Sequence, residues 1–291
     1  MAKIAFLGLG VMGYPMAGHL LKKGGHDLTV YNRTAAKAAQ WVKEYGGKSA
    51  ATPREAAQGC DFVMMCVGND DDVRAVAYGD HGALAGLKKG AILVDHTTAS
   101  AILAREIFGK AKERGIGFVD APLSGGQAGA VNGQLGIMCG GEQADFDRAK
   151  PVLDVYAKMC ALIGGPGAGQ LTKMVNQVAI VGLMQGLSEA LNFGSKAGLD
   201  MEKVIGVISK GAAQSWQMDN RWKTMVEGRF EGFGFACDWM RKDLNIALAE
   251  AKKNGASLPG TALIEQHYGR LNARGAGRWD NSALINLLAK N

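Results

Sequence analysis

The chain has 291 residues, of which 47% are hydrophobic and 21% are charged, a balance that excludes a disordered protein and allows one large core or two modest ones. The formal net charge of +6 would suit a nucleic-acid ligand, but the lysines and arginines are scattered, and the short cluster Arg241-Lys242 lies beside Asp243. We therefore expect two domains and small anionic ligands in preference to nucleic acid.

Short apolar runs alternate with amphipathic stretches in the first half of the chain. Strands are predicted at 3–9, 27–32, 61–67, 91–95, 117–120 and 135–139, and helices at 14–23, 35–45 and 102–114. This alternation is typical of βαβ units and a mainly parallel sheet. The sequence therefore predicts an α/β class, with a Rossmann-like, doubly wound parallel sheet over residues 1–164.

After the glycine-rich segment 164–170 the pattern contains no convincing strand. Helices are expected at about 168–196, 201–209, 214–226, 238–254, 259–274 and 281–289. The first would be roughly 45 Å long at about 1.5 Å per residue and is apolar nearly all round, so we expect it to be covered on every side, with a second subunit as a candidate cover. Residues 165–291 are thus predicted to form an all-α domain joined to the first by this long helix.

The five cysteines are an odd number without C-x-x-C spacing, which argues against a disulfide framework or a zinc site and favours a reducing compartment. Strand-like residues begin at Lys3, which leaves no room for a signal segment, and no window reaches about eighteen uninterrupted apolar residues. We expect a cytoplasmic protein with no metal and no membrane partner.

The segment "KIAFLGLGVMG" carries a G-x-G-x-x-G spacing directly after a predicted strand and at the start of a helix. In dinucleotide-binding folds the first glycine makes a tight turn, the second admits the pyrophosphate and the third packs helix on strand, while the helix N-terminus faces the phosphates. A glycine-rich turn without a ligand is the alternative. The context favours a cofactor site, formed here by Gly8, Leu9, Gly10, Val11, Met12 and Gly13.

The end of the second predicted strand, "DLTVYNRT", decides between the two nicotinamide cofactors. An NAD enzyme usually has a carboxylate here for the ribose hydroxyls, and this chain has Asn32, Arg33 and Thr34 instead. Because a guanidinium pairs with a 2′-phosphate, we expect these residues to bind NADP(H) in preference to NAD. The alternative is that Arg33 is an ordinary solvated surface residue.

Four separated stretches carry a family resemblance. They are "FLGLGVMGYPMAGHL" (6–20), "DAPLSGGQAGA" (120–130), "GAGQLTKMVNQ" (167–177) and "WMRKDLNIAL" (239–248). In this order and spacing, the chain resembles the β-hydroxyacid dehydrogenase family, which includes 3-hydroxyisobutyrate dehydrogenase, tartronate semialdehyde reductase and the glyoxylate/succinic semialdehyde reductases. The larger 6-phosphogluconate dehydrogenases share the pattern, but 291 residues leave no room for their extended helical domain.

The resemblance implies hydride transfer to or from the β-carbon of a small hydroxy acid by a homodimer or homotetramer joined through the helical domain. The segment "YNRT" resembles the NADPH-using reductase branch. Further cofactor contacts are implied at Val67, Gly68 and Thr98, after two predicted strands, where open α/β sheets bind ligands. Thr98 could also serve as a helix cap before "ASAILAREI".

The segment "DAPLSGG" is expected to bind the substrate carboxylate. Ser124, Gly125 and Gly126 follow a predicted strand, and glycines free backbone N–H groups to face an anion, while the serine hydroxyl adds one donor. An ordinary glycine turn is the alternative for this motif taken alone. In the family this segment holds the small carboxylate substrate.

Hydride transfer from an alcohol needs one group that takes the hydroxyl proton. Among the histidines only His96 lies near a predicted ligand edge, and the resemblance instead assigns the role to Lys173. A lysine needs burial or a nearby positive charge to act as a base near neutral pH. The resemblance implies such a charge in Lys242, whose family counterpart reaches the nicotinamide and the substrate.

Positions three and four residues after Lys173 share its helical face, which places Asn176 and Gln177 beside it. The family commonly has asparagine at the second of these positions and uses it to orient the substrate. Gln177 offers the same donor and acceptor on a longer arm, so this departure concerns the identity of the substrate more than the reaction.

Two functions of different classes follow from these patterns. The first is an NADPH-preferring dehydrogenase or reductase of small β-hydroxy acids or their semialdehydes, with Lys173 as general acid/base. The second is a non-catalytic dinucleotide-binding or assembly protein that keeps the fold. The joint presence of Ser124, Lys173 and Lys242 favours the enzyme.

Overall fold

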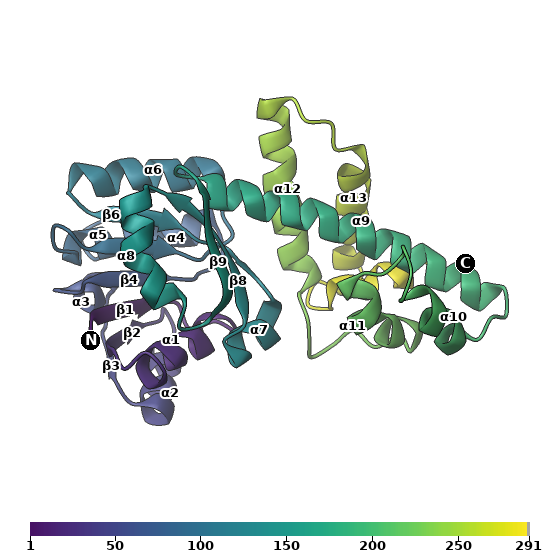
Figure 1. Ribbon diagram of the computed structural model, residues 1–291, viewed down its shortest axis with the longest axis horizontal. Coiled ribbons are helices and arrows are strands. Elements are labelled where there is room, and N and C mark those ends of the chain that lie inside the picture. Colours follow the sequence, from purple (N-terminus) through teal and green to yellow (C-terminus); the bar gives the residue numbers. More distant parts are fainter. Residues whose placement is uncertain (290–291) are drawn as a thin grey trace. The chain divides into compact units, whose positions relative to one another are not determined.

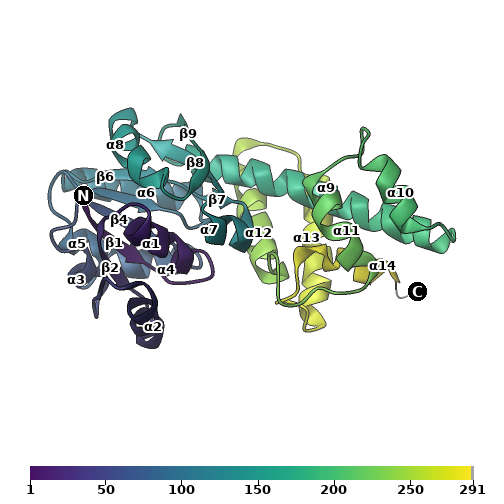
Figure 2. The ribbon, with the colours of Figure 1, turned by 60° about the horizontal axis from the view of Figure 1, so that its bottom comes forward.

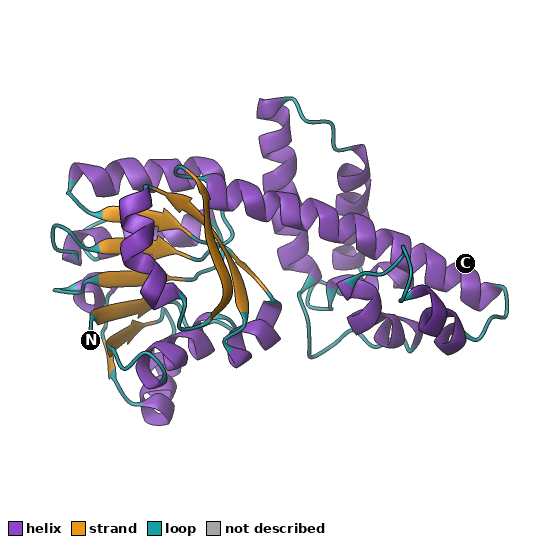
Figure 3. Ribbon diagram, in the orientation of Figure 1, coloured by secondary structure: helices purple, strands orange, loops and turns teal. Residues whose placement is uncertain are grey.

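The computed structural model describes residues 1–289, which divide into two compact units, residues 1–173 and residues from 174 onward. The named strands of this described part all lie in the first unit, and the second is built from helices (Figure 3). The predicted fold class is therefore confirmed. The domain boundary predicted at residue 164 stays a prediction, since the compact units divide inside a long helix.

Within the described residues, one sheet of nine strands organises the first unit. The strands are β1 (Lys3–Leu7), β2 (Asp27–Tyr31), β3 (Lys48–Ser49), β4 (Phe62–Met65), β5 (Ile92–Asp95), β6 (Gly117–Asp120), β7 (Leu123–Ser124), β8 (Leu135–Gly141) and β9 (Ala157–Gly164). Their order is β3-β2-β1-β4-β5-β6-β8-β7, with β9 paired to β8. The first six in this order are parallel, and their order is that of a Rossmann fold.

Helices cover both faces of this sheet because the buried side chains of each strand alternate between two cores (Figure 1). Ile4 and Phe6 of β1 belong to one core, and Ala5 and Leu7 belong to the other. This period of two is what a strand buried on both faces requires. The helices are α1 (Gly13–Lys22), α2 (Ala35–Tyr45), α3 (Pro53–Ala57), α4 (Asp70–Ala77), α5 (Ala83–Gly86), α6 (Ala101–Glu113), α7 (Gly126–Asn132) and α8 (Gln143–Leu153).

The second unit packs its helices around one apolar core (Figure 2). These elements are α9 (Ala168–Lys196), which begins in the first unit, then α10 (Met201–Ile208), α11 (Trp216–Val226), α12 (Cys237–Asn254), α13 (Pro259–Ala273), the 3-10 helix η1 (Asn281–Ile285) and α14 (Asn286–Ala289). Val181, Met184 and Leu191 of α9 are buried in this core. None of the helices described is long and apolar enough to cross a membrane.

Sequence reasoning missed the three strands β3, β7 and β9 and the helices α3, α4, α5, α7 and α8, and it predicted one helix of the wrong type. β3 and β7 have two residues each, too few for a periodic signal, whereas β9 contains the apolar run 159–163, a signal that the predicted strands left out. The helix predicted at 281–289 begins as a 3-10 helix over Asn281–Ile285, with Asp280 as its N-cap residue and all five residues buried. Within one copy of the chain α9 is not covered on every side, since Val175 and Phe193 are 70% and 74% exposed, so its expected cover by a second subunit stays a prediction.

Candidate active site

The loop between β1 and α1 has the geometry of a dinucleotide loop. Gly8 has φ of 99°, and a Cβ there would lie 2.2 Å from the carbonyl oxygen of Cys66. A Cβ on Gly13 would lie 2.0 Å from the Gly8 carbonyl oxygen, whereas one on Gly10 would meet nothing within 4 Å. The chain's own packing requires the first and third glycines, and the second leaves open space. These residues fit a pyrophosphate that approaches the backbone at Gly10, ahead of the N-terminus of α1.

The polar residues after β2 differ in their contacts. Asn32 Oδ1 accepts a hydrogen bond from the Leu9 N–H at 2.9 Å, so this side chain fixes the glycine loop. The Arg33 side chain is 87% exposed and its Nη1 lies 3.1 Å from Asp72 Oδ1 of α4. Thr34 is the N-cap residue of α2, but its side chain makes no capping hydrogen bond. Residues 32–34 therefore offer a guanidinium and a hydroxyl at the surface and no carboxylate.

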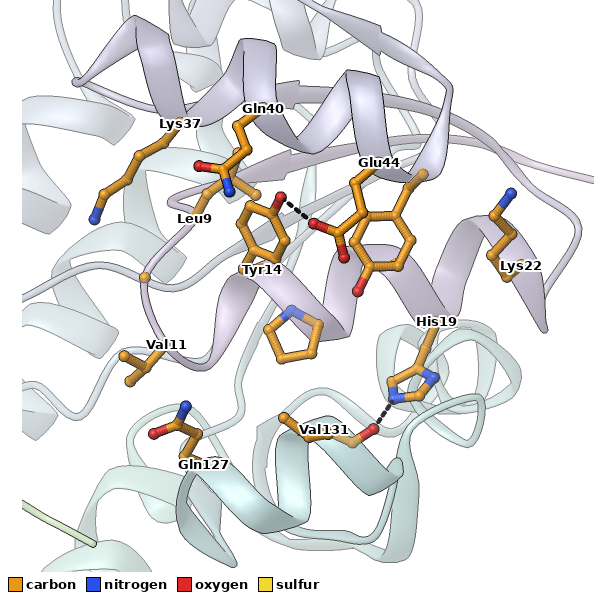
Figure 4. A pocket seen from close by; sticks show the side chains of 14 residues that line it. Leu9, Val11, Tyr14, His19, Lys22, Lys37, Gln40, Glu44, Gln127 and Val131 are labelled. Atoms are coloured by element: carbon orange, nitrogen blue, oxygen red, sulfur yellow. Dashed lines mark hydrogen bonds between the residues drawn. The ribbon is translucent and has the colours of Figure 1, made fainter. Parts of the chain in front are cut away.

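A cavity of about 480 Å³ opens beside the glycine loop, between α1, α2 and α7 (Figure 4). Leu9, Gly10 and Val11 line one end, and Val11 is 62% exposed there. Lys37, in the first turn of α2, also lines the cavity. Sequence reasoning missed this lysine, although its position three residues after Thr34 was a signal for it.

A hydrogen bond between two side chains joins α1 and α2 in the wall of this cavity. The Tyr14 hydroxyl donates to Glu44 Oε2 at 2.7 Å (Figure 4). Burial and this carboxylate raise the pKa of Tyr14 to about 12, so the phenol keeps its proton. Met12, the remaining predicted cofactor residue of the loop, is half-buried and is the N-cap residue of α1.

The loops after β4 and β5 are joined by a hydrogen bond. The Val67 N–H donates to the Thr97 hydroxyl at 3.0 Å, and Gly68 and Thr98 lie half-buried next to these residues. Ser100, and not Thr98, caps α6, because its hydroxyl accepts from the Leu103 N–H at 3.1 Å. The capping alternative for Thr98 is therefore wrong.

The segment Ser124–Gly125–Gly126 leads from β7 into α7. Ser124 is half-buried on β7 and pairs with Gly136 of β8. Gly125 and Gly126 have φ of 119° and 58°, which side chains other than hydrogen rarely allow. The two glycines thus turn the chain sharply after Ser124.

His96 is a core residue with both ring nitrogens engaged. It is 2% exposed, with Nδ1 2.7 Å from the Ala121 carbonyl oxygen and Nε2 2.8 Å from the Tyr156 hydroxyl. Since a carbonyl only accepts, Nδ1 carries the proton and Nε2 accepts from the tyrosine. Burial lowers the pKa of His96 to about 4, so the ring is neutral at physiological pH. These contacts exclude His96 as the proton carrier.

Two buried carboxyl groups lie side by side at the ends of β5 and β6. Asp95 and Asp120 are register partners, and burial raises their pKa values to about 7 and about 6. Asp120 accepts the N–H groups of Gly167 and Gln170 at 2.8 and 2.9 Å, which opposes the effect of burial. Asp120 thereby caps the start of α9. Lys173 follows within the first two turns of that helix and is 7% exposed.

In the helical unit, the two amides and the second lysine are linked by a carboxylate. Gln177 Nε2 donates to Asp243 Oδ2 at 2.7 Å, and Asn176 Nδ2 donates to Gln177 Oε1 at 2.8 Å. Asp243 is 2% exposed, and its other oxygen, which takes no well-aligned hydrogen bond, lies 3.2 Å from Lys242 Nζ. Lys242 also lies 5.8 Å from the Trp239 ring centroid. Asp243 therefore offsets part of the positive charge of Lys242.

The structure thus groups the predicted residues into two sets, one in each unit. The glycine loop, residues 32–34, the loops after β4 and β5, and Lys173 belong to the first unit, and Asn176, Gln177 and Lys242 belong to the second. The five cysteines are free thiols, and the described residues contain no cluster of three or more histidines, cysteines or acids that could hold a metal. Sequence reasoning missed Gln170, Asp120 and Asp243, whose partners are distant in the chain.

Comparisons with known proteins identify the family of this chain. Residues 3–164 match the model for the NAD binding domain of 6-phosphogluconate dehydrogenase, and residues 167–288 match that for the NAD-binding domain of NADP-dependent 3-hydroxyisobutyrate dehydrogenase. An uncharacterized oxidoreductase of Shewanella frigidimarina is 62% identical over 100% of this chain and 99% of its own. The 2-hydroxy-3-oxopropionate reductase of Escherichia coli is 35% identical over 98% of this chain and 97% of its own.

Among solved structures, 3-hydroxyisobutyrate dehydrogenase of Mycobacterium tuberculosis with L-serine superposes with a TM-score of 0.90. It is 29% identical, with 99% of each chain covered. Two matching family models span nearly the whole chain, and the relatives named above include oxidoreductases of hydroxy acids. The chain therefore belongs to the β-hydroxyacid dehydrogenase family and is an NAD(P)-dependent oxidoreductase that acts on CH–OH groups.

Proposed function

We propose that this protein transfers a hydride between NADP(H) and a small β-hydroxy acid or its semialdehyde, with Lys173 as the general acid/base. The nicotinamide supplies or accepts the hydride when the cofactor is bound. In the reducing direction the Lys173 ammonium gives a proton to the carbonyl oxygen, and in the oxidising direction its amine takes the hydroxyl proton.

The observation that carries this proposal is the burial of Lys173. Its side chain is 7% exposed in the second turn of α9, on a helix that is otherwise mainly apolar. Removing water from an amine disfavours its ammonium form, which is the condition for a lysine to give up a proton near neutral pH. Both ring nitrogens of His96, the other candidate on this edge, are already hydrogen-bonded within the core.

The preference for NADP(H) rests on the cations around the glycine loop. Arg33 is exposed at the end of β2, and Lys37 lines the neighbouring cavity with Gly10. Arg33 pairs with Asp72, but an exposed ion pair of this kind stabilises the fold little, so a 2′-phosphate can replace the carboxylate as its partner.

Replacing Arg33 with aspartate should weaken NADPH binding by about tenfold to a hundredfold and NADH binding by much less, because a charge-assisted hydrogen bond contributes about 1.5–3 kcal/mol. Fluorescence titration with both cofactors measures this. Lys43→Asp is the matched control, since Lys43 is exposed in the last turn of α2 and the substitution changes the net charge equally. Equal losses for NADPH and NADH in Arg33→Asp would show that Arg33 does not read the phosphate.

The proposed substrate is a small carboxylate with a hydroxyl or aldehyde at the β-carbon. Ser124 and the following glycines offer a hydroxyl and backbone N–H groups for the carboxylate. The relatives' substrates, 3-hydroxyisobutyrate and 2-hydroxy-3-oxopropionate, belong to this class. The test is a panel of 3-hydroxyisobutyrate, 4-hydroxybutyrate, glycolate, tartronate and serine with their oxidised forms, assayed in both directions with both cofactors. Absence of turnover throughout would overturn the proposal.

We also propose that the exposed face of α9 joins two copies of this chain. Residues 175, 179, 182, 183, 186, 190 and 193 are all exposed, are all apolar or glycine, and lie on one side of the helix. A Cβ on Gly182 or Gly186 would meet nothing within 4 Å, so a second helix can approach closely there. Because the same face is present on each copy, a two-fold symmetric contact satisfies both.

Phe193→Glu should convert the assembly to monomers, because it places a charge within an apolar contact. Light scattering after size exclusion measures the mass. Leu263→Glu, which changes an exposed leucine of α13 outside this face, is the control and should leave the mass unchanged. A wild-type protein that is monomeric at micromolar concentration would refute the proposal.

A further inference from the structure

We propose that Gln170 is a positioning residue for Lys173, because its side chain fastens the first turn of α9 to the loop that follows β5. The inference rests on the proposed function, in which Lys173 carries the proton, and on the predicted cofactor contact of Thr98 in the loop after β5.

The Gln170 side chain is wholly engaged with that loop. It is 1% exposed, its Nε2 donates to the Thr97 carbonyl oxygen at 2.7 Å, and its Oε1 accepts from the Ala99 N–H at 3.0 Å. These two backbone groups flank Thr98, a predicted cofactor contact. Thr97 in turn accepts from the Val67 N–H at 3.0 Å, so one amide links both ligand-edge loops to α9.

The backbone of the same turn is fixed independently. The Asp120 carboxylate accepts the N–H groups of Gly167 and Gln170 at 2.8 and 2.9 Å. A Cβ on Gly169 would lie 2.4 Å from the Met138 carbonyl oxygen, which is backbone and cannot move aside. The helix therefore starts against the strand ends with almost no freedom to shift.

The Gln170 side chain does not act as a helix cap. A cap satisfies N–H groups of its own helix, and Asp120 already does this, whereas Gln170 bonds only to groups of the loop at residues 97 and 99. One side chain must both donate and accept here, and among the residues of this size a neutral amide does so. Gln170 and Lys173 are three residues apart and share one helical face, so fixing the first fixes the second.

The rate of hydride transfer depends strongly on the position of the proton carrier relative to the cofactor. A displacement of about 1 Å of a catalytic group costs up to about a hundredfold in rate. Without the Gln170 contacts, Asp120 and Gly169 would still hold the start of the helix that carries Lys173, but the loop that carries Thr98 would no longer be held at a fixed distance from it. Hydride transfer should then slow, although the cofactor and the substrate still bind.

The experiment is a single-turnover measurement on the full-length protein with NADPH and the substrate that the panel identifies. The variants are Gln170→Met, which keeps the length and removes both hydrogen bonds, and Gln170→Glu, which keeps only the acceptor. In this measurement the amplitude gives the fraction of active molecules and the rate gives the chemical step. Gln185→Met, on the same helix with a local bond to Glu189 at 2.7 Å, is the control.

We expect Gln170→Met to keep its amplitude and its NADPH affinity within about threefold while its rate falls about tenfold to a hundredfold. Gln170→Glu should lose at least as much rate as Gln170→Met, because its carboxylate would face the Thr97 carbonyl oxygen, and Gln185→Met should match the wild type. A reduced amplitude with an unchanged rate in Gln170→Met would mean that Gln170 only stabilises the fold. An unchanged rate and amplitude would show that Gln170 does not position Lys173. Lys173→Ala in the same assay separates the two ideas, because its full activity would refute the proposed function itself.

Discussion

Replacing Lys173 with alanine should lower kcat by about a thousandfold or more while NADPH affinity stays within about threefold. A positioned proton carrier contributes roughly 10²–10⁴-fold to a rate, and a lysine that makes no cofactor contact contributes little to cofactor binding. Steady-state kinetics and fluorescence titration measure the two effects. Retained NADPH binding also shows that the variant is folded.

Two further variants sharpen this result. Lys173→Arg keeps the positive charge but cannot release a proton near neutral pH, so it should be as inactive as Lys173→Ala. Lys196→Ala removes an exposed lysine from the last turn of the same helix and should leave kcat unchanged. Added small primary amines should partly restore turnover in Lys173→Ala, because they supply the missing proton carrier. Near wild-type turnover in that variant would end the assignment of Lys173 as acid/base.

The sequence predicted most of the fold because its signals are local. Alternating apolar runs and amphipathic stretches place six strands and the long helix α9 within a few residues of their observed bounds. The glycines are equally local, since a tight turn and a close helix-strand contact depend on neighbours a few residues away. β9 was missed although residues 159–163 form an apolar run, and in the structure this strand pairs with β8 and its residues are half-buried or exposed.

The contacts that organise the site could not be predicted in the same way. Gln170 bonds to residues 71 and 73 positions earlier, and Gln177 bonds to Asp243 across 66 positions. No pattern within one helix shows such partners. The motif residues were visible, but the sequence did not show that Asp120 caps α9 or that Asp243 faces Gln177.

Gln177, which stands where the family commonly has asparagine, has a structural partner in Asp243. Its amide donates to the buried Asp243 carboxylate and accepts from Asn176. An asparagine would be one methylene shorter and could not reach the same carboxylate from the same backbone position. The longer side chain therefore serves the contact between α9 and α12, and Asn176 becomes the more exposed of the two amides.

The glycine loop allows cofactor binding and folding to be separated by two alanine substitutions. Gly10→Ala should leave thermal unfolding unchanged, because a Cβ there meets nothing within 4 Å, yet weaken NADPH binding by about tenfold or more, because the methyl group fills the space for the pyrophosphate. Gly13→Ala should lower the free energy of unfolding by about 3 kcal/mol, since its Cβ would lie 2.0 Å from the Gly8 carbonyl oxygen and 2.9 Å from the Phe6 ring.

Thermal unfolding without cofactor and NADPH titration measure the two effects on each variant. Gly109→Ala is the control, because that glycine lies inside α6 with nothing within 4 Å of an added Cβ and should gain slightly in stability. A Gly10→Ala variant with wild-type NADPH affinity would show that the pyrophosphate passes elsewhere, even if the fold is unchanged. A Gly10→Ala variant that is less stable than the wild type would mean that the loop adopts another conformation. The space beside Gly10 is therefore open to the cofactor only if this variant unfolds at the wild-type temperature and binds NADPH poorly.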